Sequence, residues 1–183
     1  MLYEQLSIEK LYHEQQQQSS TKATEPFVVS RGQGLSVENF GKMKQTKGGL
    51  MSFNNFLSTS ENHQVSLQYA REGTSINSNM VGILFIMTID PAICSKSSIP
   101  YVDVNKDGYF KDDESEILFT THTIFRIDRI KQIQDDHTDR LWEVQLTLVG
   151  NDNHELSTLT AHIRQESNWT TGWSRLGDIL IKL

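Results

Sequence analysis

The chain has 183 residues and a mass of 20.9 kDa, which favours one domain with a sizeable core over two small ones. Its 17 basic and 23 acidic residues give a formal charge of −6, and this balance argues against a general nucleic-acid binder, which needs a positive field. The single cysteine, Cys94, excludes an internal disulfide framework and a cysteine-rich zinc site.

The first predicted element is a helix over residues 2–18, with leucines on part of one face. A run of glutamines and small polar residues follows, so that residues 1–25 read as a helix and a polar linker. The start of the chain carries Glu4 and Glu9 and lacks the apolar core of a signal peptide. Together with the lone cysteine, this predicts a cytoplasmic protein.

The next part of the sequence predicts short elements separated by turn residues. Pro26 opens a strand at residues 27–29, and we expect Gly32 and Gly34 to break it. The further expected elements are a helix capped by Ser36 and ending near Met43, a turn at 47–49, an extended stretch at 50–57, and a helix at 64–72 capped by Ser60.

The second half of the chain is rich in predicted strands. Residues 81–89 are apolar on both faces, which is typical of a central strand, and the run is about half as long as a membrane span. Two strands are expected at 116–120 and 123–130, and the strict alternation at 141–148 predicts a half-buried strand. Helices are expected at 154–165 and 173–183. Strands clustered without regular helical crossovers indicate an α+β fold.

Three short segments carry the residues of chemical interest. Residues 28–34 (VVSRGQG) place Arg31 before glycines, residues 56–60 (FLSTS) contain Ser58, and residues 114–119 (ESEILF) place two glutamates at the start of an apolar strand. Each segment alone has an ordinary explanation, as a turn, a cap or a solvated strand end. In this order and at these separations they resemble the arginine–serine–glutamate class of mono-ADP-ribosyltransferases, over residues 2–166.

The resemblance is strongest to the eukaryotic arginine-specific enzymes, including forms that carry tetratricopeptide repeats. It implies an ADP-ribosyltransferase-like α+β fold of two packed, mostly antiparallel sheets with flanking helices around an NAD cleft. It implies a catalytic core at residues 26–166, with 167–183 as a closing helix or the start of such a repeat. The implied activity is transfer of ADP-ribose from NAD to arginine side chains of proteins.

The resemblance also implies roles for two carboxylates and a serine. Glu116 would stabilise the positive charge that develops on the ribose as the nicotinamide bond breaks, and would hold the ribose 2′-hydroxyl. Glu114, two residues away on the same strand face, would hold the incoming guanidinium. Ser58 would donate a hydrogen bond to Glu116 and would not act as a nucleophile, since its context suggests no base.

Five further residues would bind the dinucleotide. Arg31 would grip the pyrophosphate, and Gly32 would let the backbone approach the nicotinamide amide. Asn55 and Arg71 lie where the family often places a ribose contact and a phosphate contact. Tyr69 would offer an aromatic face to nicotinamide, or else belong to the core of a helix face. The resemblance implies that NAD is a substrate and that no metal is required, and neither a nucleic acid nor a membrane is an expected partner.

Residues 103–114 complicate this interpretation, because they match the twelve-residue calcium loop D-x-[DN]-x-[DN]-G-x5-E in full. An EF-hand requires a helix on each side of the loop, whereas the flanking residues 98–102 and 117–119 read as strands. We therefore expect a polar loop that presents the glutamates, without bound calcium. Two alternatives to the transferase remain open: an NAD glycohydrolase, in which water replaces the acceptor, and a catalytically silent calcium-binding or interaction module.

Overall fold

The computed structural model describes Lys10 and residues 25–53, 55–97, 101–104, 116–121 and 123–150. The chain divides into two compact units, Met1–Val149 and Gly150–Leu183, and the helices and strands below belong to the first. The helices predicted at 154–165 and 173–183, and that at 2–18 apart from Lys10, lie outside the described residues. The predicted domain boundaries stay predictions.

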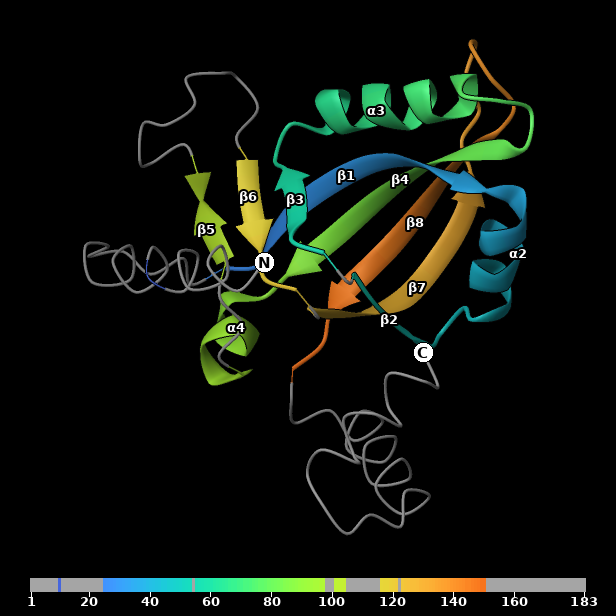
Figure 1. Ribbon diagram of the computed structural model, residues 1–183. Helices are drawn as coiled ribbons and strands as arrows, with labels where there is room; N and C mark the ends of the chain where they lie inside the picture. The colour runs from blue at the N-terminus through green and yellow to red at the C-terminus, as the bar shows by residue number, and fades with distance from the viewer. Residues whose placement is uncertain are drawn as a thin grey trace, which may run out of the picture. The chain divides into compact units, whose positions relative to one another are not determined.

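In the described part of the chain, eight strands form one sheet in the order β2-β7-β8-β4-β1-β3-β6-β5 (Figure 1). The strands are β1 (Phe27–Ser36), β2 (Leu50–Ser52), β3 (Leu57–Ser60), β4 (Met80–Ile89), β5 (Tyr101–Asp103), β6 (Glu116–Phe119), β7 (Ile124–Gln132) and β8 (Leu141–Leu148). The helices are α2 (Val37–Gln45), α3 (His63–Ser75) and α4 (Pro91–Ser97). β4 and β8 run parallel, and the other neighbouring pairs are antiparallel. The predicted α+β class and mostly antiparallel pairing are confirmed.

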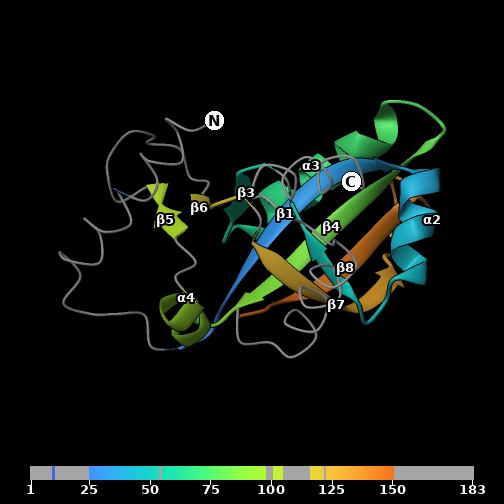
Figure 2. The ribbon, with the colours of Figure 1, turned by 60° about the horizontal axis from the view of Figure 1, so that its bottom comes forward.

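The sheet is continuous, which corrects the expectation of two separate packed sheets. β1 pairs with β4 along its whole length, but it pairs with β3 only through Ser30 and Ser60. The β3–β6–β5 part runs at a steep angle to β1 in Figure 1 and stands to one side in Figure 2. The structure therefore has no boundary between two sheets in its described part; it has a junction within one sheet, where β3 diverges from β1.

The core lies on both faces of the central strand β4. Ile83, Phe85 and Met87 alternate along the strand and are fully buried in the larger core cluster. On the opposite face Leu84 packs with Ala70 of α3 and Leu141 of β8 in a smaller cluster. The prediction of a central strand buried on both faces is confirmed, and α3 covers one of these faces (Figure 1).

Gly32 and Gly34 do not break β1, and that prediction is wrong. The strand continues to Ser36 because these glycines allow α3 to lie directly against it. A Cβ atom on Gly32 would come within 1.8 Å of the Ser66 carbonyl oxygen, and one on Gly34 within 3.0 Å of the Gly73 carbonyl oxygen. The glycines therefore serve close packing of a helix on a strand.

Several local predictions can be compared directly with the structure. The Ser36 hydroxyl caps α2 by accepting from the Asn39 N–H at 3.2 Å, as expected. The cap of α3 is Asn62, not Ser60, whose hydroxyl instead accepts from the Asn62 N–H. The extended stretch at 50–57 is two separate strands, β2 and β3, and α4 was not predicted. Among the described residues, no helix combines the length and apolar character needed to cross a membrane.

Candidate active site

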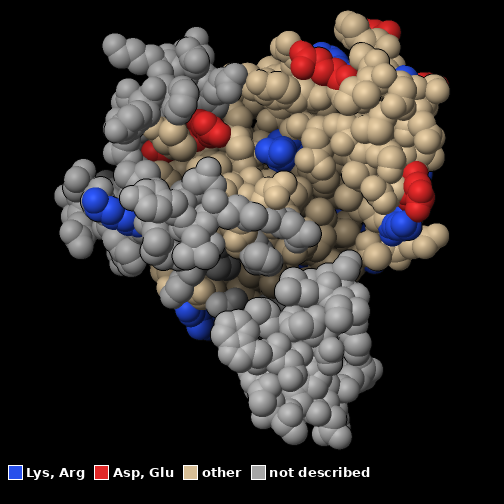
Figure 3. Space-filling model, in the orientation of Figure 1, with Lys and Arg blue, Asp and Glu red and all other residues tan. Residues whose placement is uncertain are grey.

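A cavity of about 240 Å³ opens where β3 diverges from β1, below α3. On the face drawn in Figure 3, an isolated basic patch lies in a hollow of a largely uncharged surface, and acidic patches lie around it at a greater distance from the hollow. The cavity lining combines β1, β3, β6 and α3, through Ser30, Arg31, Gly32, Ser58, Thr59, Ser60, Val65, Ser66, Tyr69 and Glu116. Five residues predicted for the site from sequence thus meet here.

Ser58 and Glu116 are brought together by the pairing of β3 with β6. The register places Ser60 opposite Glu116 and Ser58 opposite Leu118. The Ser58 hydroxyl donates a hydrogen bond to Glu116 Oε1 at 2.5 Å, a length typical of hydroxyl donation to an ionised carboxylate. Next to it, the Thr59 hydroxyl donates to the Ile117 carbonyl at 2.7 Å and ties the two strands together. The Glu116 carboxylate is thus held in one orientation inside the cavity.

Arg31 supplies a positive charge to the same cavity. Its Nη1 donates to the Ser58 carbonyl at 2.8 Å, and its Nε donates to Gln33 Oε1 at 3.2 Å. Burial lowers the pKa of the Arg31 guanidinium, while the nearby Glu116 charge acts in the opposite direction. Arg31 still stays cationic, since a guanidinium does not deprotonate in proteins near neutral pH. A fixed cation therefore stands close to the fixed carboxylate.

The remaining wall comes from α3, which presents Val65, Ser66 and Tyr69 to the cavity. The Tyr69 side chain is 51% exposed, so it belongs to the rim of the cavity and not to the core of a helix face. Ser30 and Ser60 are buried on the other side, where the Ser30 hydroxyl donates to the Ser60 carbonyl at 3.2 Å. The lining is thus mostly hydroxyl and backbone groups around one cation and one anion.

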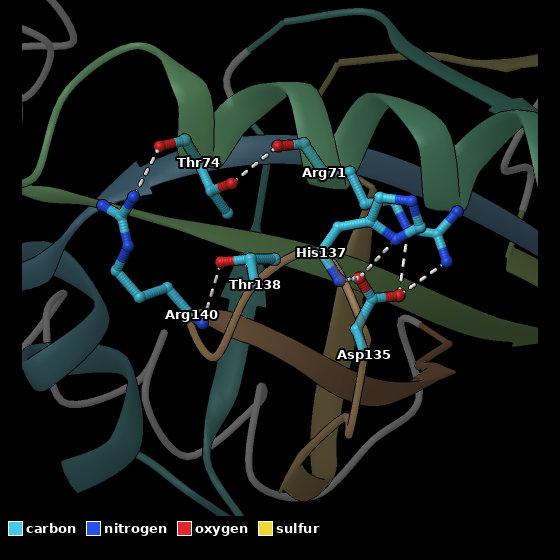
Figure 4. Close-up of polar contacts among 6 residues, drawn as sticks. All are labelled: Arg71, Thr74, Asp135, His137, Thr138 and Arg140. Atoms are coloured by element: carbon cyan, nitrogen blue, oxygen red, sulfur yellow. Dashed lines mark hydrogen bonds and ion pairs between the residues drawn. The ribbon is translucent and has the colours of Figure 1, made fainter.

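Three predicted site residues are not part of this lining. Asn55 is exposed, and Glu114 lies outside the described residues. Arg71 points from α3 toward the loop between β7 and β8, where its Nε and Nη2 donate to Asp135 Oδ2 at 2.9 and 2.5 Å (Figure 4). The Arg71 hydrogen bond holds the pKa of Asp135 below its ordinary value. The NAD contacts expected of Asn55 and Arg71 and the acceptor contact expected of Glu114 stay predictions.

The calcium-loop pattern at residues 103–114 connects two strands of the structure. β5 ends at Asp103, β6 begins at Glu116, and the two strands pair antiparallel. The expectation that strands flank the pattern is confirmed, and an EF-hand would need helices there. Residues 105–115 themselves lie outside the described part of the chain. Among the described residues, no group of three histidine, cysteine or acidic side chains gathers as a metal site would require.

Sequence reasoning missed four polar residues at or beside the cavity. Ser30, Ser60 and Ser66 line it, and Gln33 holds Arg31. Serines carry little signal in a sequence, because they are common at strand ends and helix caps. Gln33 did offer a signal, since it is a polar residue two positions from Arg31 in a strand whose other inward positions are apolar.

A scan of protein-family models and a search of curated proteins found no match. Solved structures do match. The ADP-ribosyltransferase Vis, from Vibrio splendidus, in complex with an inhibitor superposes with a TM-score of 0.50 at 19% identity, over 70% of this chain and 50% of that one. HopU1 of Pseudomonas syringae gives 0.48 at 14% identity, over 69% of this chain and 47% of that one. C3larvin toxin of Paenibacillus larvae gives a TM-score of 0.49 at 18% identity, over 81% of this chain and 78% of that one.

The chain thus spans about half the length of Vis. The superposition with Vis identifies the fold of this chain as the ADP-ribosyltransferase fold.

Proposed function

We propose that this protein transfers ADP-ribose from NAD to arginine side chains of proteins and releases nicotinamide. One observation carries the proposal: the Ser58 hydroxyl holds Glu116 at 2.5 Å in a cavity that also contains Arg31. The fold supports it, because solved proteins that share this fold are ADP-ribosyltransferases. Fold alone does not decide chemistry, so the arrangement of the three side chains is the stronger support.

Glu116 is suited to assist the breaking of the bond between ribose and nicotinamide. As that bond breaks, its electron pair leaves with nicotinamide and the ribose acquires oxocarbenium character, as in glycoside hydrolysis. A carboxylate that is already oriented stabilises this charge without having to reorganise. The Ser58 hydrogen bond provides the orientation, and the partly buried setting strengthens the interaction between the two charges.

Arg31 and the cavity rim are suited to bind NAD. Hydrogen bonds to Gln33 and to the Ser58 carbonyl occupy two of the five guanidinium N–H groups. The other three can donate to pyrophosphate oxygens, which match a planar guanidinium well. The Gly32 backbone in the lining and the exposed ring of Tyr69 are available to the nicotinamide amide and its aromatic ring.

The acceptor would be held by Glu114, two residues before Glu116. A protonated guanidinium is a poor nucleophile, and a carboxylate beside it can orient the nitrogen and take its proton as the new bond to ribose forms. The new bond joins a guanidino nitrogen to the ribose carbon that loses nicotinamide. An exposed arginine on a protein is the proposed acceptor. Activity in the cytoplasm and a neighbouring tetratricopeptide-repeat region are further proposals.

Incubation with NAD labelled in its adenylate part and with agmatine, a small guanidino compound, tests the proposal. We expect labelled ADP-ribosyl agmatine, together with one nicotinamide for each transfer. Glu116→Gln should strongly reduce the formation of both products. Glu143→Gln is a matched control, because this partly buried glutamate is also hydrogen-bonded but lies on β8, outside the cavity lining. Nicotinamide release without transfer would indicate a glycohydrolase, and no nicotinamide release at all would contradict the proposal.

A further inference from the structure

The inward face of β1 is apolar except at two neighbouring positions. Phe27, Val29 and Leu35 contribute to the main core cluster from this face. Between Val29 and Leu35, alternation along the strand gives two more positions on this inward face, and Arg31 and Gln33 occupy them. Across the sheet they pair in register with Phe85 and Ile83, both fully buried. A glutamine in such a row loses hydration, so its position requires a compensating partner.

That partner is the Arg31 guanidinium. Gln33 Oε1 accepts from Arg31 Nε at 3.2 Å, while the Ser58 carbonyl accepts from Nη1 at 2.8 Å. Because the two acceptors bind different nitrogens of the guanidinium, they fix both the position and the plane of this planar group. With only the Ser58 carbonyl, the guanidinium could still turn about that single contact.

We propose that Gln33 is a positioning residue that fixes the plane of the Arg31 guanidinium, so that its remaining N–H groups face the NAD pyrophosphate. This inference rests on the proposed function, because it assumes that Arg31 binds NAD. Gln33 itself is not among the residues that line the cavity. Its effect on NAD must therefore pass through Arg31, which makes the inference testable.

Replacing Gln33 by leucine removes the acceptor and keeps a similar volume. By calorimetry we expect NAD to bind the Gln33→Leu variant about tenfold more weakly, because binding must then orient the guanidinium that the hydrogen bond to Gln33 orients beforehand. The turnover rate at saturating NAD should stay close to that of the unaltered protein, because Glu116 and Ser58 are unchanged. The melting temperature should change little, since the burial of leucine on an apolar sheet face offsets the lost hydrogen bond. A purely structural glutamine would give the reverse: lower melting temperature and unchanged NAD affinity.

Gln145→Leu is the matched control. Gln145 is also a partly buried strand glutamine with a side-chain hydrogen bond, here to Glu143 at 2.8 Å, and it lies on β8 away from the cavity lining. We expect this variant to bind NAD as the unaltered protein does. An equal loss of affinity in both variants would overturn the inference, because the effect would then not depend on Arg31.

A double-mutant cycle tests the route through Arg31. In a protein that already carries Arg31→Ala, Gln33→Leu should cause no further loss of NAD affinity, because coupled residues are not additive. Additive losses would overturn the inference. If the unaltered chain binds no NAD, the proposed function fails and this inference fails with it. If the unaltered chain binds NAD and the Gln33→Leu variant binds it equally well, only the role of Gln33 is overturned.

Nuclear magnetic resonance of the ligand-free protein provides a readout that does not depend on NAD. The Arg31 Nε–H proton should be protected from exchange in the unaltered protein, and the protection should be lost in Gln33→Leu and kept in Gln145→Leu. An Nε–H that exchanges freely in the unaltered protein would overturn the hold of Gln33 on Arg31.

Discussion

Ser58 connects the two charges of the candidate site. Its backbone carbonyl accepts from Arg31, and its hydroxyl donates to Glu116. The cation and the anion are therefore positioned by opposite ends of one residue on one short strand. Because β3 is also tied to β6 through Thr59, a shift of this strand would move both charges together. A substitution such as Ser58→Ala removes only the hydroxyl, so it should release the Glu116 carboxylate and leave the carbonyl that holds Arg31 in place.

Glu116, at the start of β6, and Glu114, two residues before it in the sequence, should separate in their effects. Glu116→Gln keeps the side-chain volume and removes the charge that would face the ribose. We expect nicotinamide release and transfer to fall together, by about a hundred- to a thousandfold, as for loss of other electrostatic stabilisers. Glu114→Gln should abolish transfer to agmatine while slow hydrolysis of NAD persists, because it leaves the ribose contact unchanged. Parallel assays of nicotinamide and of labelled agmatine measure both steps.

Two results would contradict this division of roles. If Glu114→Gln stopped hydrolysis as completely as Glu116→Gln, then Glu114 would contribute to bond breaking. If Glu116→Gln left transfer intact, the assignment of the whole site would be wrong.

At the scale of elements, α3 is held on the sheet by backbone contact. The closest approaches involve Gly32 and Gly82 of the sheet, where an added Cβ would lie 1.8 and 2.1 Å from the carbonyl oxygens of Ser66 and Ala70. No side chain fits between helix and strand at these points. Since α3 forms one wall of the cavity, this packing places Ser66 and Tyr69 beside Arg31.

Gly32→Ala should therefore displace α3 and destabilise the protein. The added methyl group would meet backbone, which cannot rotate away, so we expect a loss on the order of 3 kcal/mol in the free energy of unfolding. Gly41→Ala is the contrasting change, because nothing lies within 4 Å of an added Cβ there and Gly41 lies inside α2. It should stabilise by about 0.5–1 kcal/mol. Urea denaturation of both variants measures the difference, and equal effects would refute the packing argument.

The C-terminal end of α3 is held by the loop between β7 and β8. The Arg140 guanidinium donates to the carbonyls of Thr74, Asn77 and Met80 at 2.9–3.0 Å. Arg71 meets Asp135 in the same loop, as Figure 4 shows. Cations near a helix C-terminus also interact favourably with the helix dipole. The loop thus fixes the end of the helix that forms one wall of the cavity.

Asp135→Asn should change how stability depends on pH. The hydrogen bond from Arg71 lowers the pKa of Asp135 below its ordinary value of 3.8. A carboxyl whose pKa is lower in the folded protein stabilises it at neutral pH, and this contribution disappears as the pH falls through the folded pKa. We expect Asp135→Asn to lower the melting temperature at pH 7. Below pH 3.8 the difference in melting temperature between this variant and the unaltered protein should become smaller.

Asp136→Asn is the matched control for that measurement, since Asp136 is the adjacent exposed residue of the same loop. It should change the melting temperature little at any pH. If the difference in melting temperature between Asp135→Asn and the unaltered protein stayed constant from pH 7 to below pH 3.8, the proposed contribution of the Asp135 charge to stability would be refuted.

For the whole molecule, strands with strict alternation or a continuous apolar run were predictable and their partners were not. The alternation at 141–148 and the apolar run at 81–89 correspond to β8 and β4. The parallel pairing of these two strands depends on the topology of the whole sheet, which no local pattern encodes. The effect of Gly32 was misjudged for the same reason, because the helix that requires a glycine there, α3, begins only at His63.

The candidate site was predictable where the order and spacing of three segments resemble those of a known enzyme family. Arg31, Ser58 and Glu116 were identified from sequence and lie together in the structure. Arg71 is as distinctive as Arg31, yet it contacts Asp135, since its direction depends on where it falls around α3. Gln33 was missed although its polar side chain interrupts an apolar row, because its hydrogen bond with Arg31 depends on the geometry of the folded strand.

NAD should stabilise the folded protein as a whole. A ligand that binds only the native state raises the free energy of unfolding by mass action, by about 2.7 kcal/mol at a hundred times its dissociation constant. For a chain of 183 residues this corresponds to a rise in melting temperature of about 5–10 °C. Arg31→Ala should lose most of this rise, because the pyrophosphate would lose its cationic partner.

Arg129→Ala, which removes an exposed arginine of β7 outside the cavity lining, should keep the rise in melting temperature. Differential scanning fluorimetry over a range of NAD concentrations measures the rise in each protein. An equal rise in the unaltered protein and in folded Arg31→Ala would show that NAD binds without Arg31 and would remove the proposed site.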